Sequence, residues 1–415
     1  MTLRESDLIY DWNRLGQGDL EPARPRLELD DETLRDGLQS PSVLTPTIDE
    51  KLEILHYIAE LGIEGANIGL PGAGPHVVRD VTRLAREIVD QKLPISPNCA
   101  ARTLRADLEP IVEVSQSTGI AIEVACFIGS SPIRQYAETW KIDRMLKLTQ
   151  EAVEYATGEG LPVMFVTEDT TRAHPDDLRR LYTVAIEAGA RRLCIADTVG
   201  HATPSGTGHL VRFIRDLADR SGEQVKVDWH GHKDRGLSVI NALTAAAAGA
   251  DRLHGTAIGI GERVGNTPID QLLVNMQLLG WIDRDLSKLP AYCRRVSEAT
   301  GVPLPDNYPI FGKDAFRTGT GVHAAAIIKA RAKGDDWLAD RIYSGVPAAM
   351  IGRRQRIEIG PMCGESNIVY WLEERGIAAE SELVGQILRA AKEATRVLEE
   401  QELLDICRSC GAQVG

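Results

Sequence analysis

Two histidines, His230 and His232, stand two residues apart in the segment KVDWHGH (226–232), which is predicted to be a β-strand. Side chains at positions i and i+2 of a strand project from the same face, so the two imidazoles would lie side by side. Such a pair is compatible with capped or solvated histidines as well as with a bound metal ion. Asp36, at the end of the first predicted strand, would add a carboxylate and leave coordination positions open for substrate or water. These three residues therefore predict a divalent metal ion acting as a Lewis acid, and the ligand types are compatible with zinc, manganese or magnesium.

The elements that must position these residues follow a regular pattern. Short apolar segments alternate with longer amphipathic segments between about residues 27 and 280, which is typical of parallel strands joined by helices. We predict strands at 27–34, 65–70, 94–98, 121–128, 162–169, 192–197, 226–232 and 252–259. We predict helices at 47–62, 76–91, 136–160, 174–190, 205–222 and 236–250. Eight such units favour an α/β fold of the (β/α)8 TIM-barrel type.

An open Rossmann sheet is less compatible with the sequence, because it would need a GxGxxG turn after the first strand, where the chain has LRDGLQS. We expect the barrel to span residues 27–285. An N-terminal arm (1–26) precedes it, and a smaller, mainly helical C-terminal region (286–415) follows, with a long helical stretch at 377–408.

The active site of a TIM barrel lies at the C-terminal ends of its strands, so the polar residues at these ends are the candidates for chemistry. Arg35 could stabilise negative charge on an oxygen, or could form an ion pair with a neighbouring carboxylate. Glu168 could act as a general acid or base, or could pair with Arg172. His254 stands in the middle of a strand among apolar residues and is interpreted as a satisfied core histidine.

The composition excludes several classes of function. The formal net charge of −13 argues against general binding to nucleic acid or to anionic membranes. No apolar run approaches the roughly 20 residues needed to span a bilayer, and the N-terminus lacks a signal-peptide core. The seven cysteines are scattered, which is typical of a reducing compartment, so a cytoplasmic location is expected. The CRSC segment (407–410) is a weak zinc or redox signal, and an ordinary helix end explains it better.

Two long motifs resemble those of a known family. DETLRDGLQS (31–40) resembles the TLRDG motif, and the segment from HGHKDRG to GIGERVGN (230–266) resembles the HxHND…GADxVHGTxxGIGERxGN signature, of the 2-isopropylmalate synthase and homocitrate synthase family. This family belongs to the HMG-CoA lyase-like superfamily of TIM-barrel metalloenzymes. The resemblance covers about 27–280 strongly and 310–375 more loosely. It implies an acyltransferase of amino-acid biosynthesis that condenses acetyl-CoA, or a related acyl-CoA, with a 2-oxo acid and then hydrolyses the thioester.

The resemblance also assigns roles to the residues at the strand ends. It implies that Asp36, His230 and His232 bind the metal, with Asn266 as a further ligand or a group that supports one. Arg35 would steady the incipient alkoxide, because a guanidinium can stabilise negative charge that develops on oxygen. The resemblance further implies that Glu168 is a catalytic glutamate and that Thr198 contacts the substrate carboxylate.

The C-terminal region supplies two further candidates through the resemblance. His323, in TGTGVHAAAI (318–327), matches the histidine that deprotonates the acyl-CoA methyl group, and Tyr343 is the best match for a catalytic tyrosine. In the family this region lies over the barrel of the partner subunit, which implies a homodimer whose active site is completed in trans. The chain stops near residue 415, so no C-terminal leucine-binding regulatory domain is expected.

The sequence departs from the family pattern at three positions that bear on the choice of 2-oxo acid. Many members have an acid where Asn67 stands, a histidine where Ala125 stands, and a histidine where Arg134 stands. Loss of a contact at Ala125 could enlarge or reshape the pocket. Arg134 could bind an additional carboxylate or could pair at the surface.

Other functions remain open from the sequence. One is another alkylmalate synthase, such as a citramalate synthase. Another is a lyase of the HMG-CoA type, but that group has a cysteine in a glycine loop after the eighth strand, where this chain has GIGERVGN. A third is a scaffold without catalysis, which would be expected to have lost one of Arg35, Asp36, His230 and His232, whereas all four are present.

Overall fold

The computed structural model describes residues 5–14 and 20–413 of the chain. They form two compact units, each of which is described here by itself. The first unit extends to Arg284 and also includes residues 291–302, and the second comprises residues 285–290 and those from 303 onward. Helix α11 (Leu289–Thr300) thus belongs mainly to the first unit, although it follows the last barrel strand in the chain by more than 30 residues.

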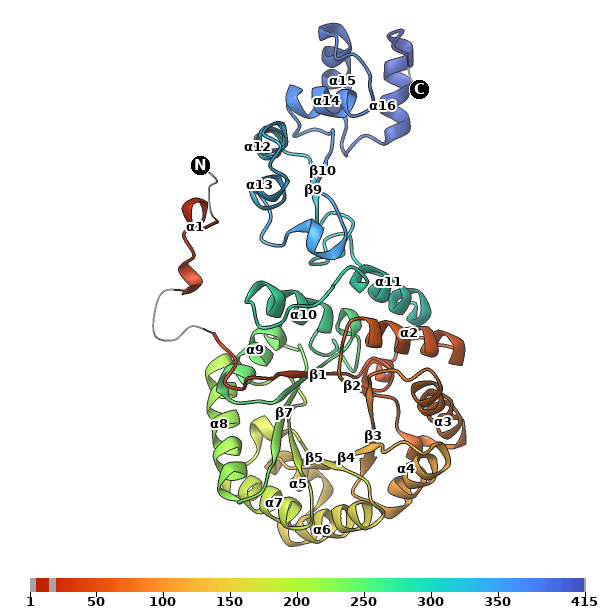
Figure 1. The fold of residues 1–415 in the computed structure, drawn as a ribbon, viewed down its shortest axis with the longest axis vertical. Helices are drawn as coiled ribbons and strands as arrows, with labels where there is room; N and C mark the ends of the chain where they lie inside the picture. Colours follow the sequence, from red (N-terminus) through yellow and green to blue (C-terminus); the bar gives the residue numbers. More distant parts are fainter. Residues whose placement is uncertain (1–4, 15–19, 414–415) are drawn as a thin grey trace. The chain divides into compact units, whose positions relative to one another are not determined.

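The first unit is a closed barrel of eight parallel strands in chain order, which confirms the TIM-barrel prediction (Figure 1). Strand β1 closes the ring, because Asp30 lies opposite Gly65 of β2 on one side and opposite His254 of β8 on the other. The strands are β1 (Glu28–Asp31), β2 (Gly65–Asn67), β3 (Ser96–Arg102), β4 (Glu123–Gly129), β5 (Val163–Glu168), β6 (Arg192–Asp197), β7 (Lys226–Gly231) and β8 (Arg252–Gly255). All eight predicted strands are therefore present, although β3 extends four residues beyond its predicted end.

Helices surround the strands (Figure 1), and their sequences explain why they pack there. Helix α3 buries Val81, Leu84, Ala85 and Ile88, whose spacing of three and four residues gives one apolar stripe. The helices of this unit are α1 (Glu5–Leu8), α2 (Ile48–Glu60), α3 (Pro75–Asp90), α4 (Arg105–Thr118), α5 (Pro132–Glu138), α6 (Ile142–Gly158), α7 (Pro175–Glu187), α8 (Pro204–Arg220), α9 (Ser238–Ala248), α10 (Ile269–Leu278) and α11.

Two features of the helices differ from the prediction. The helix predicted at 136–160 is two helices, α5 and α6, because Thr139 adopts a left-handed conformation (φ 56°) that ends α5. Helix α4 was not among the predicted helices. Pro110 lies within this helix, and a proline usually indicates that a helix ends. In this protein the helix continues past Pro110 to Thr118.

Charged residues fill the barrel interior near the N-terminal ends of the strands. Asp228 is fully buried and receives hydrogen bonds from Arg192 Nη1 and Arg252 Nε, each at 2.7 Å. Both arginines also pair with Glu123, at 3.2 and 2.6 Å. Buried charges are tolerated when each has a partner of opposite sign, and this network meets that condition.

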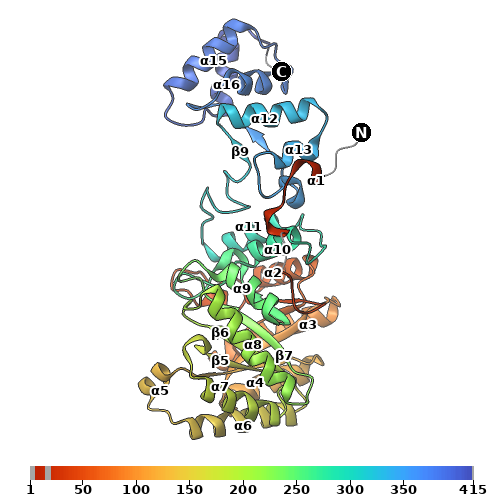
Figure 2. The same ribbon diagram turned by 90° about the vertical axis from the view of Figure 1, so that its left-hand side faces the viewer.

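The second unit is mainly helical, as predicted for the C-terminal region (Figure 2). It contains the short strands β9 (Arg317–Thr318) and β10 (Arg356–Ile357) and the helices α12 (Gly321–Ala332), α13 (Asp336–Arg341), α14 (Glu365–Glu373), α15 (Ser381–Glu393) and α16 (Glu400–Ser409). The single helical stretch predicted at 377–408 is wrong, because Ala394 has an extended backbone (ψ 152°) that separates α15 from α16. The CRSC segment lies at the end of α16, where Cys407 is buried and Cys410 is exposed.

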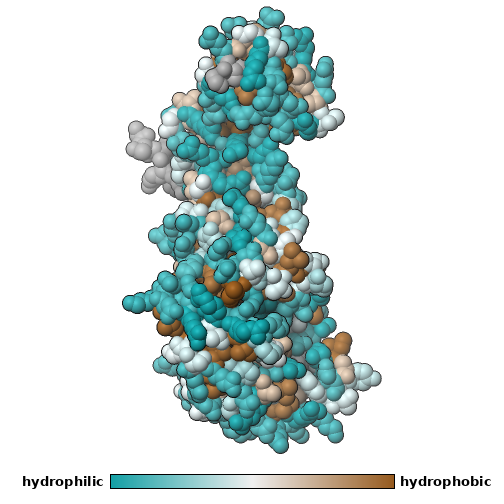
Figure 3. Space-filling model, turned by 90° about the vertical axis from the view of Figure 1, so that its right-hand side faces the viewer, coloured by the Kyte–Doolittle hydropathy of each residue, from teal (hydrophilic) through white to brown (hydrophobic). Residues whose placement is uncertain are grey.

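The surface shown in Figure 3 is dominated by hydrophilic residues, with hydrophobic residues in small groups between them. Among the described helices, none combines the length and the apolar character needed to cross a bilayer.

Candidate active site

A cavity of about 300 Å³ opens at the C-terminal ends of the barrel strands. Its lining comes entirely from the first unit: Glu32, Arg35, Asp36, Gln39, Leu70, Ala100, Ala125, Phe127, Met164, Val166, Glu168, Cys194, Ala196, Thr198, His230, His232, His254 and Glu262. The cavity thus brings together most of the barrel residues that the sequence singled out.

The predicted metal ligands converge in this cavity. The Nε2 atoms of His230 and His232 lie 3.2 Å apart, and Asp36 Oδ2 lies 3.7 and 3.6 Å from them. The sequence spacing explains the histidine pair, and closure of the barrel brings β1 and its following turn close to β7. Asp36, His230 and His232 form one of two groups of residues in the described chain whose donor atoms are close enough to hold a metal ion.

The electrostatic environment suits these three side chains for binding a cation. Burial, together with the neighbouring His230, lowers the pKa of His232 to about 4, so its imidazole is neutral at pH 7 and has a free lone pair. Burial acts to raise the pKa of Asp36, but Arg35 and His230 outweigh it and lower the pKa below its usual value. Two imidazole nitrogens and one carboxylate oxygen within 4 Å of one another are a typical donor set for a divalent metal.

Asn266 reaches this group through a glycine-dependent turn. Gly265 has φ 101°, and a Cβ atom at this position would lie only 1.9 Å from the carbonyl oxygen of Gly259, so only glycine fits. The turn places Asn266 Nδ2 2.5 Å from Asp36 Oδ2, while Asn266 Oδ1 is buried without a hydrogen-bond partner. Asn266 therefore holds the carboxylate of Asp36 in place.

Arg35 lies against the same group. Its guanidinium donates to Asp36 Oδ1 at 2.8 Å and to Glu32 Oε1 at 2.9 Å, so it does form ion pairs with neighbouring carboxylates. The Asn67 amide, oriented so that both of its ends have partners, accepts from Arg35 Nε at 3.3 Å. Asn67 is fully buried and lies behind Arg35, outside the cavity lining.

Glu168 and Arg134 face each other at another part of the rim. Glu168 Oε1 lies 3.1 Å from Arg134 Nε, and Arg134 also donates to Glu138 at 3.1 Å. Burial raises the pKa of Glu168, and the nearby Arg134 opposes this effect. The alternative pairing of Glu168 with Arg172 is wrong, because Arg172 binds Asp169 at 2.7 Å.

Thr198 lies beside Glu168 on the cavity wall. Its hydroxyl oxygen accepts a hydrogen bond from the backbone nitrogen of Asp169 at 2.8 Å. Because a hydroxyl that accepts one hydrogen bond still has a proton to donate, Thr198 can donate a hydrogen bond to a substrate oxygen.

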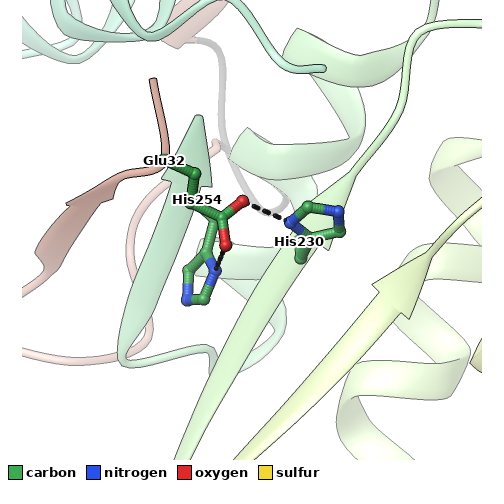
Figure 4. Close-up of side chains that lie close together, drawn as sticks. All are labelled: Glu32, His230 and His254. Carbon is green, nitrogen blue, oxygen red and sulfur yellow. Dashed lines mark hydrogen bonds and ion pairs between the residues drawn. The ribbon is translucent and has the colours of Figure 1, made fainter. Parts of the chain in front are cut away.

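Glu32 was not identified as a site residue from the sequence, yet it is central to the arrangement (Figure 4). Its carboxylate lies between two histidines: Oε2 accepts from His230 Nδ1 at 2.6 Å, and Oε1 lies 3.3 Å from His254 Nδ1. Its pKa is lowered well below its usual value, because His230 and Arg35 overcome the effect of burial. A hydrogen bond to an ionised carboxylate requires a proton on His230 Nδ1, so Nε2, the nitrogen nearer Asp36, is the one that can bind a metal.

His254 is a satisfied buried histidine, as interpreted from the sequence, but its partners are charged. Its Nε2 lies 3.0 Å from Asp228 Oδ2, and its Nδ1 faces Glu32. Burial opposes the charged form, but these two carboxylates outweigh it and raise the pKa of His254 to about 10. The alternation that places His230 and His232 on one face also predicts that Asp228 faces inward. This pattern in the sequence could have indicated that Asp228 is a partner of His254.

His323 and Tyr343 lie in the second unit. Their rings stack, with centroids 4.1 Å apart and an interplanar angle of 27°. The structure therefore brings together the two C-terminal residues that the family resemblance singled out, 20 positions apart in the chain.

The fold and the site define the class of protein. The family model described as HMGL-like matches residues 26–295, and the chain belongs to this family of TIM-barrel enzymes. Solved structures show the same fold: the HMG-CoA lyase of Bacillus subtilis matches with a TM-score of 0.57 and 20% sequence identity, over 69% of this chain and 97% of that one.

Relatives of known name place the chain in a smaller group within the HMGL-like family. A protein of Methanopyrus kandleri named as a probable 2-isopropylmalate synthase is 34% identical over 89% of this chain and 70% of its own length. The homocitrate synthase AksA of the same organism is 34% identical over 87% of this chain and 86% of its own. The chain therefore belongs to the 2-isopropylmalate synthase and homocitrate synthase group, which confirms the resemblance drawn from its motifs.

Proposed function

We propose that this enzyme condenses an acyl-CoA, with acetyl-CoA as the reference donor, with a 2-oxo acid in a Claisen-type reaction and then hydrolyses the thioester. The observation that carries the proposal is the convergence of the group Asp36, His230 and His232 with Arg35, Glu168 and Thr198 on one cavity. Relatives named 2-isopropylmalate synthase and homocitrate synthase, similar over most of the chain, support the same chemistry.

Asp36, His230 and His232 would hold a divalent cation, which supplies electrophilic activation of the keto carbon of the 2-oxo acid. Zinc, manganese and magnesium all remain compatible with this donor set. Glu32 keeps the proton of His230 on Nδ1, so that Nε2 stays available. Asn266 holds Asp36 in place through the hydrogen bond to Oδ2.

The other cavity residues act on the reacting groups. The acyl-CoA loses a proton from the carbon next to its thioester, and that carbon forms a new bond to the keto carbon while the keto oxygen takes up the negative charge. The Arg35 guanidinium stabilises this oxygen, and Thr198 donates to the substrate carboxylate. Glu168, whose pKa is raised by burial, is suited to exchanging protons with the reacting groups. Water then cleaves the thioester and releases the CoA thiol.

In this proposal, His323 and Tyr343 of the second unit remove the acyl-CoA proton. Their stacked arrangement places an imidazole beside a phenol, which are two groups able to move a proton. We propose that they act in the barrel of a partner subunit, in a cytoplasmic homodimer.

The decisive experiment is a thiol-release assay with acetyl-CoA and a panel of 2-oxo acids, with and without a chelator. We expect turnover that depends on both substrates and on the metal. His232→Ala should abolish it by removing a ligand, whereas His209→Ala, on the exposed face of α8, should not change it. No thiol release with any 2-oxo acid, together with cleavage of 3-hydroxy-3-methylglutaryl-CoA, would replace the proposal with a lyase.

A further inference from the structure

The lining of the cavity divides into two halves of different chemistry. Strands β7 and β8, with the segments that follow β1 and β8, contribute the histidines and most of the charged residues. Glu168, at the end of β5, is the one charged lining residue outside these segments. The opposite strands, β3 to β6, contribute a surface that we call the apolar half, consisting of Ala100, Ala125, Phe127, Met164, Val166 and Ala196.

The apolar half follows from the two-residue alternation of the strands. Ala125 and Phe127 on β4, and Met164 and Val166 on β5, are separated by two positions and therefore point into the same cavity. Ala125 packs with Met164 and with Cys194 of β6 in a small apolar cluster, and Val166 packs against it. In the barrel order these strands lie across from the closure between β8 and β1.

From this division, and resting on the proposed function, we infer that the 2-oxo acid has an uncharged, aliphatic side chain larger than a methyl group. The keto and carboxylate oxygens face Asp36, His230 and His232, and the side chain is seated against the apolar half. Substrates with a second carboxylate are rejected.

The charges around the cavity support the rejection of a second carboxylate. Four carboxylates line the cavity (Glu32, Asp36, Glu168 and Glu262), against a single guanidinium, that of Arg35. Arg35 is already bound by two of them, and the charged His254 lies between Glu32 and Asp228. A second negative charge on the substrate would find no unpaired cation among the described lining residues.

Two arginines that pair with lining carboxylates, Arg134 and Arg263, also have other partners. Arg134 pairs with Glu138 and Glu168, and Arg263 donates to both carboxylate oxygens of Asp234, at 2.8 and 3.1 Å. Recruiting either of them to a substrate carboxylate would leave its present partner without a cation. The departure at Arg134 from the family pattern therefore does not supply a free carboxylate site.

The small side chains on the apolar half set a lower limit on the size of the substrate's alkyl group. Ala100, Ala125 and Ala196 present only methyl groups to the cavity, which leaves room for a branched or longer alkyl chain. Each additional methylene that fills such a space is worth about 10-fold or more in kcat/KM. We therefore expect pyruvate to be a poor substrate.

The test compares 2-oxo acids of matched shape with the full-length, metal-loaded protein. 4-Methyl-2-oxopentanoate replaces the distal carboxylate of oxaloacetate by an isopropyl group, and 5-methyl-2-oxohexanoate does the same for 2-oxoglutarate. We expect the alkyl member of each pair to be favoured by about 100-fold or more in kcat/KM, because the carboxylate would be buried without a cation. A preference for either dicarboxylate overturns the inference.

Binding of the same acids, measured by calorimetry, separates this inference from the proposed function. Absence of thiol release with every acid would refute the proposed acyl transfer, yet tighter binding of the alkyl acids would still support the apolar half as their site. Equal or tighter binding of the dicarboxylates would refute the inference whether or not turnover occurs.

A substitution in the apolar half provides the second arm. Ala125→Leu should shift the kcat/KM ratio of 4-methyl-2-oxopentanoate to pyruvate by about 10-fold toward pyruvate, because the added side chain occupies the space of the alkyl group. Ala106→Leu, the same change at an exposed position of α4, should leave the ratio unchanged. If Ala125→Leu instead alters the preference among acyl-CoA chain lengths and not among 2-oxo acids, the apolar half holds the acyl group and the inference is wrong.

Discussion

The carboxylate of Glu32 lies 2.6 Å from Nδ1 of His230 (Figure 4), whereas Asp36 and His232 lie close to the other ring nitrogen, Nε2. One side chain therefore fixes both the tautomer and the orientation of a candidate metal ligand. Groups that hold a ligand in this way affect metal affinity nearly as much as the ligands themselves. The same carboxylate also accepts a hydrogen bond from Arg35, so Glu32 links the candidate metal ligand His230 to the guanidinium of Arg35.

Replacement of Glu32 should weaken metal binding. Glu32→Ala should lower the affinity for a divalent metal by about 10- to 100-fold, because His230 loses the acceptor that keeps Nε2 free. Competition with a chromogenic chelator measures this affinity directly. Glu113→Ala, at an exposed position of α4, is the control. An unchanged affinity in Glu32→Ala would show that the hydrogen bond to His230 does not tune the site.

Replacement of His254 should affect stability. His254→Leu removes the cation between Glu32 and Asp228 and leaves buried negative charge with fewer partners. We expect the free energy of unfolding to fall by about 3–5 kcal/mol, the range typical for breaking a buried ion pair. Urea denaturation at pH 7 measures the loss. His209→Leu on α8 should change stability little, and comparable stability of the two variants would show that Arg192 and Arg252 compensate for the missing imidazole.

A buried aspartate predicts a pH dependence of stability. Burial raises the pKa of Asp31 to about 6, despite hydrogen bonds from Thr33 and Tyr292. The folded state thus binds a proton more tightly than the unfolded state, whose aspartate titrates near 3.9. The contribution of Asp31 is therefore full below about pH 4 and is lost as the pH rises through about 6.

Asp31→Asn should remove this component, because the amide stays neutral and can still accept from Thr33 and donate to Tyr292. Relative to the unmodified protein, the variant should gain stability as the pH rises from about 4 to 7, by about 2–3 kcal/mol for a shift of this size. Unfolding curves recorded across this pH range measure the difference. A constant difference in stability between the two proteins from pH 4 to 7 would contradict the raised pKa.

The ion pair between Arg134 and Glu168 predicts a shift in the pH dependence of catalysis. Arg134 lowers the pKa of Glu168 and Glu138 raises it, while burial raises it most. If Glu168 acts as a base, Arg134→Gln should move the acid limb of the kcat/KM profile to higher pH, and Glu138→Gln should move it to lower pH. A profile that is the same in both variants would exclude Glu168 as the group that titrates in that limb.

Much of the barrel could be predicted from the sequence, because strand and helix periodicities are local properties of the chain. The eight strands and the convergence of Asp36, His230 and His232 follow from the two-residue alternation and from the rule that strand ends meet on one face of a barrel. The boundaries between helices were less certain. A single left-handed residue, Thr139, divides the helix predicted at 136–160.

The sequence by itself determined the family and the convergence of Asp36, His230 and His232 at one end of the barrel, but it did not identify Glu32 as a lining residue. Only the tertiary structure decided which charges pair. Asp169 adopts a left-handed conformation (φ 59°) in the turn after β5, and Arg172 pairs with it, which leaves Glu168 to Arg134. The position of Glu32 between His230 and His254 likewise depends on closure of β1 against β8, because hydrogen bonds between residues about 200 positions apart are set by three-dimensional packing and not by local sequence.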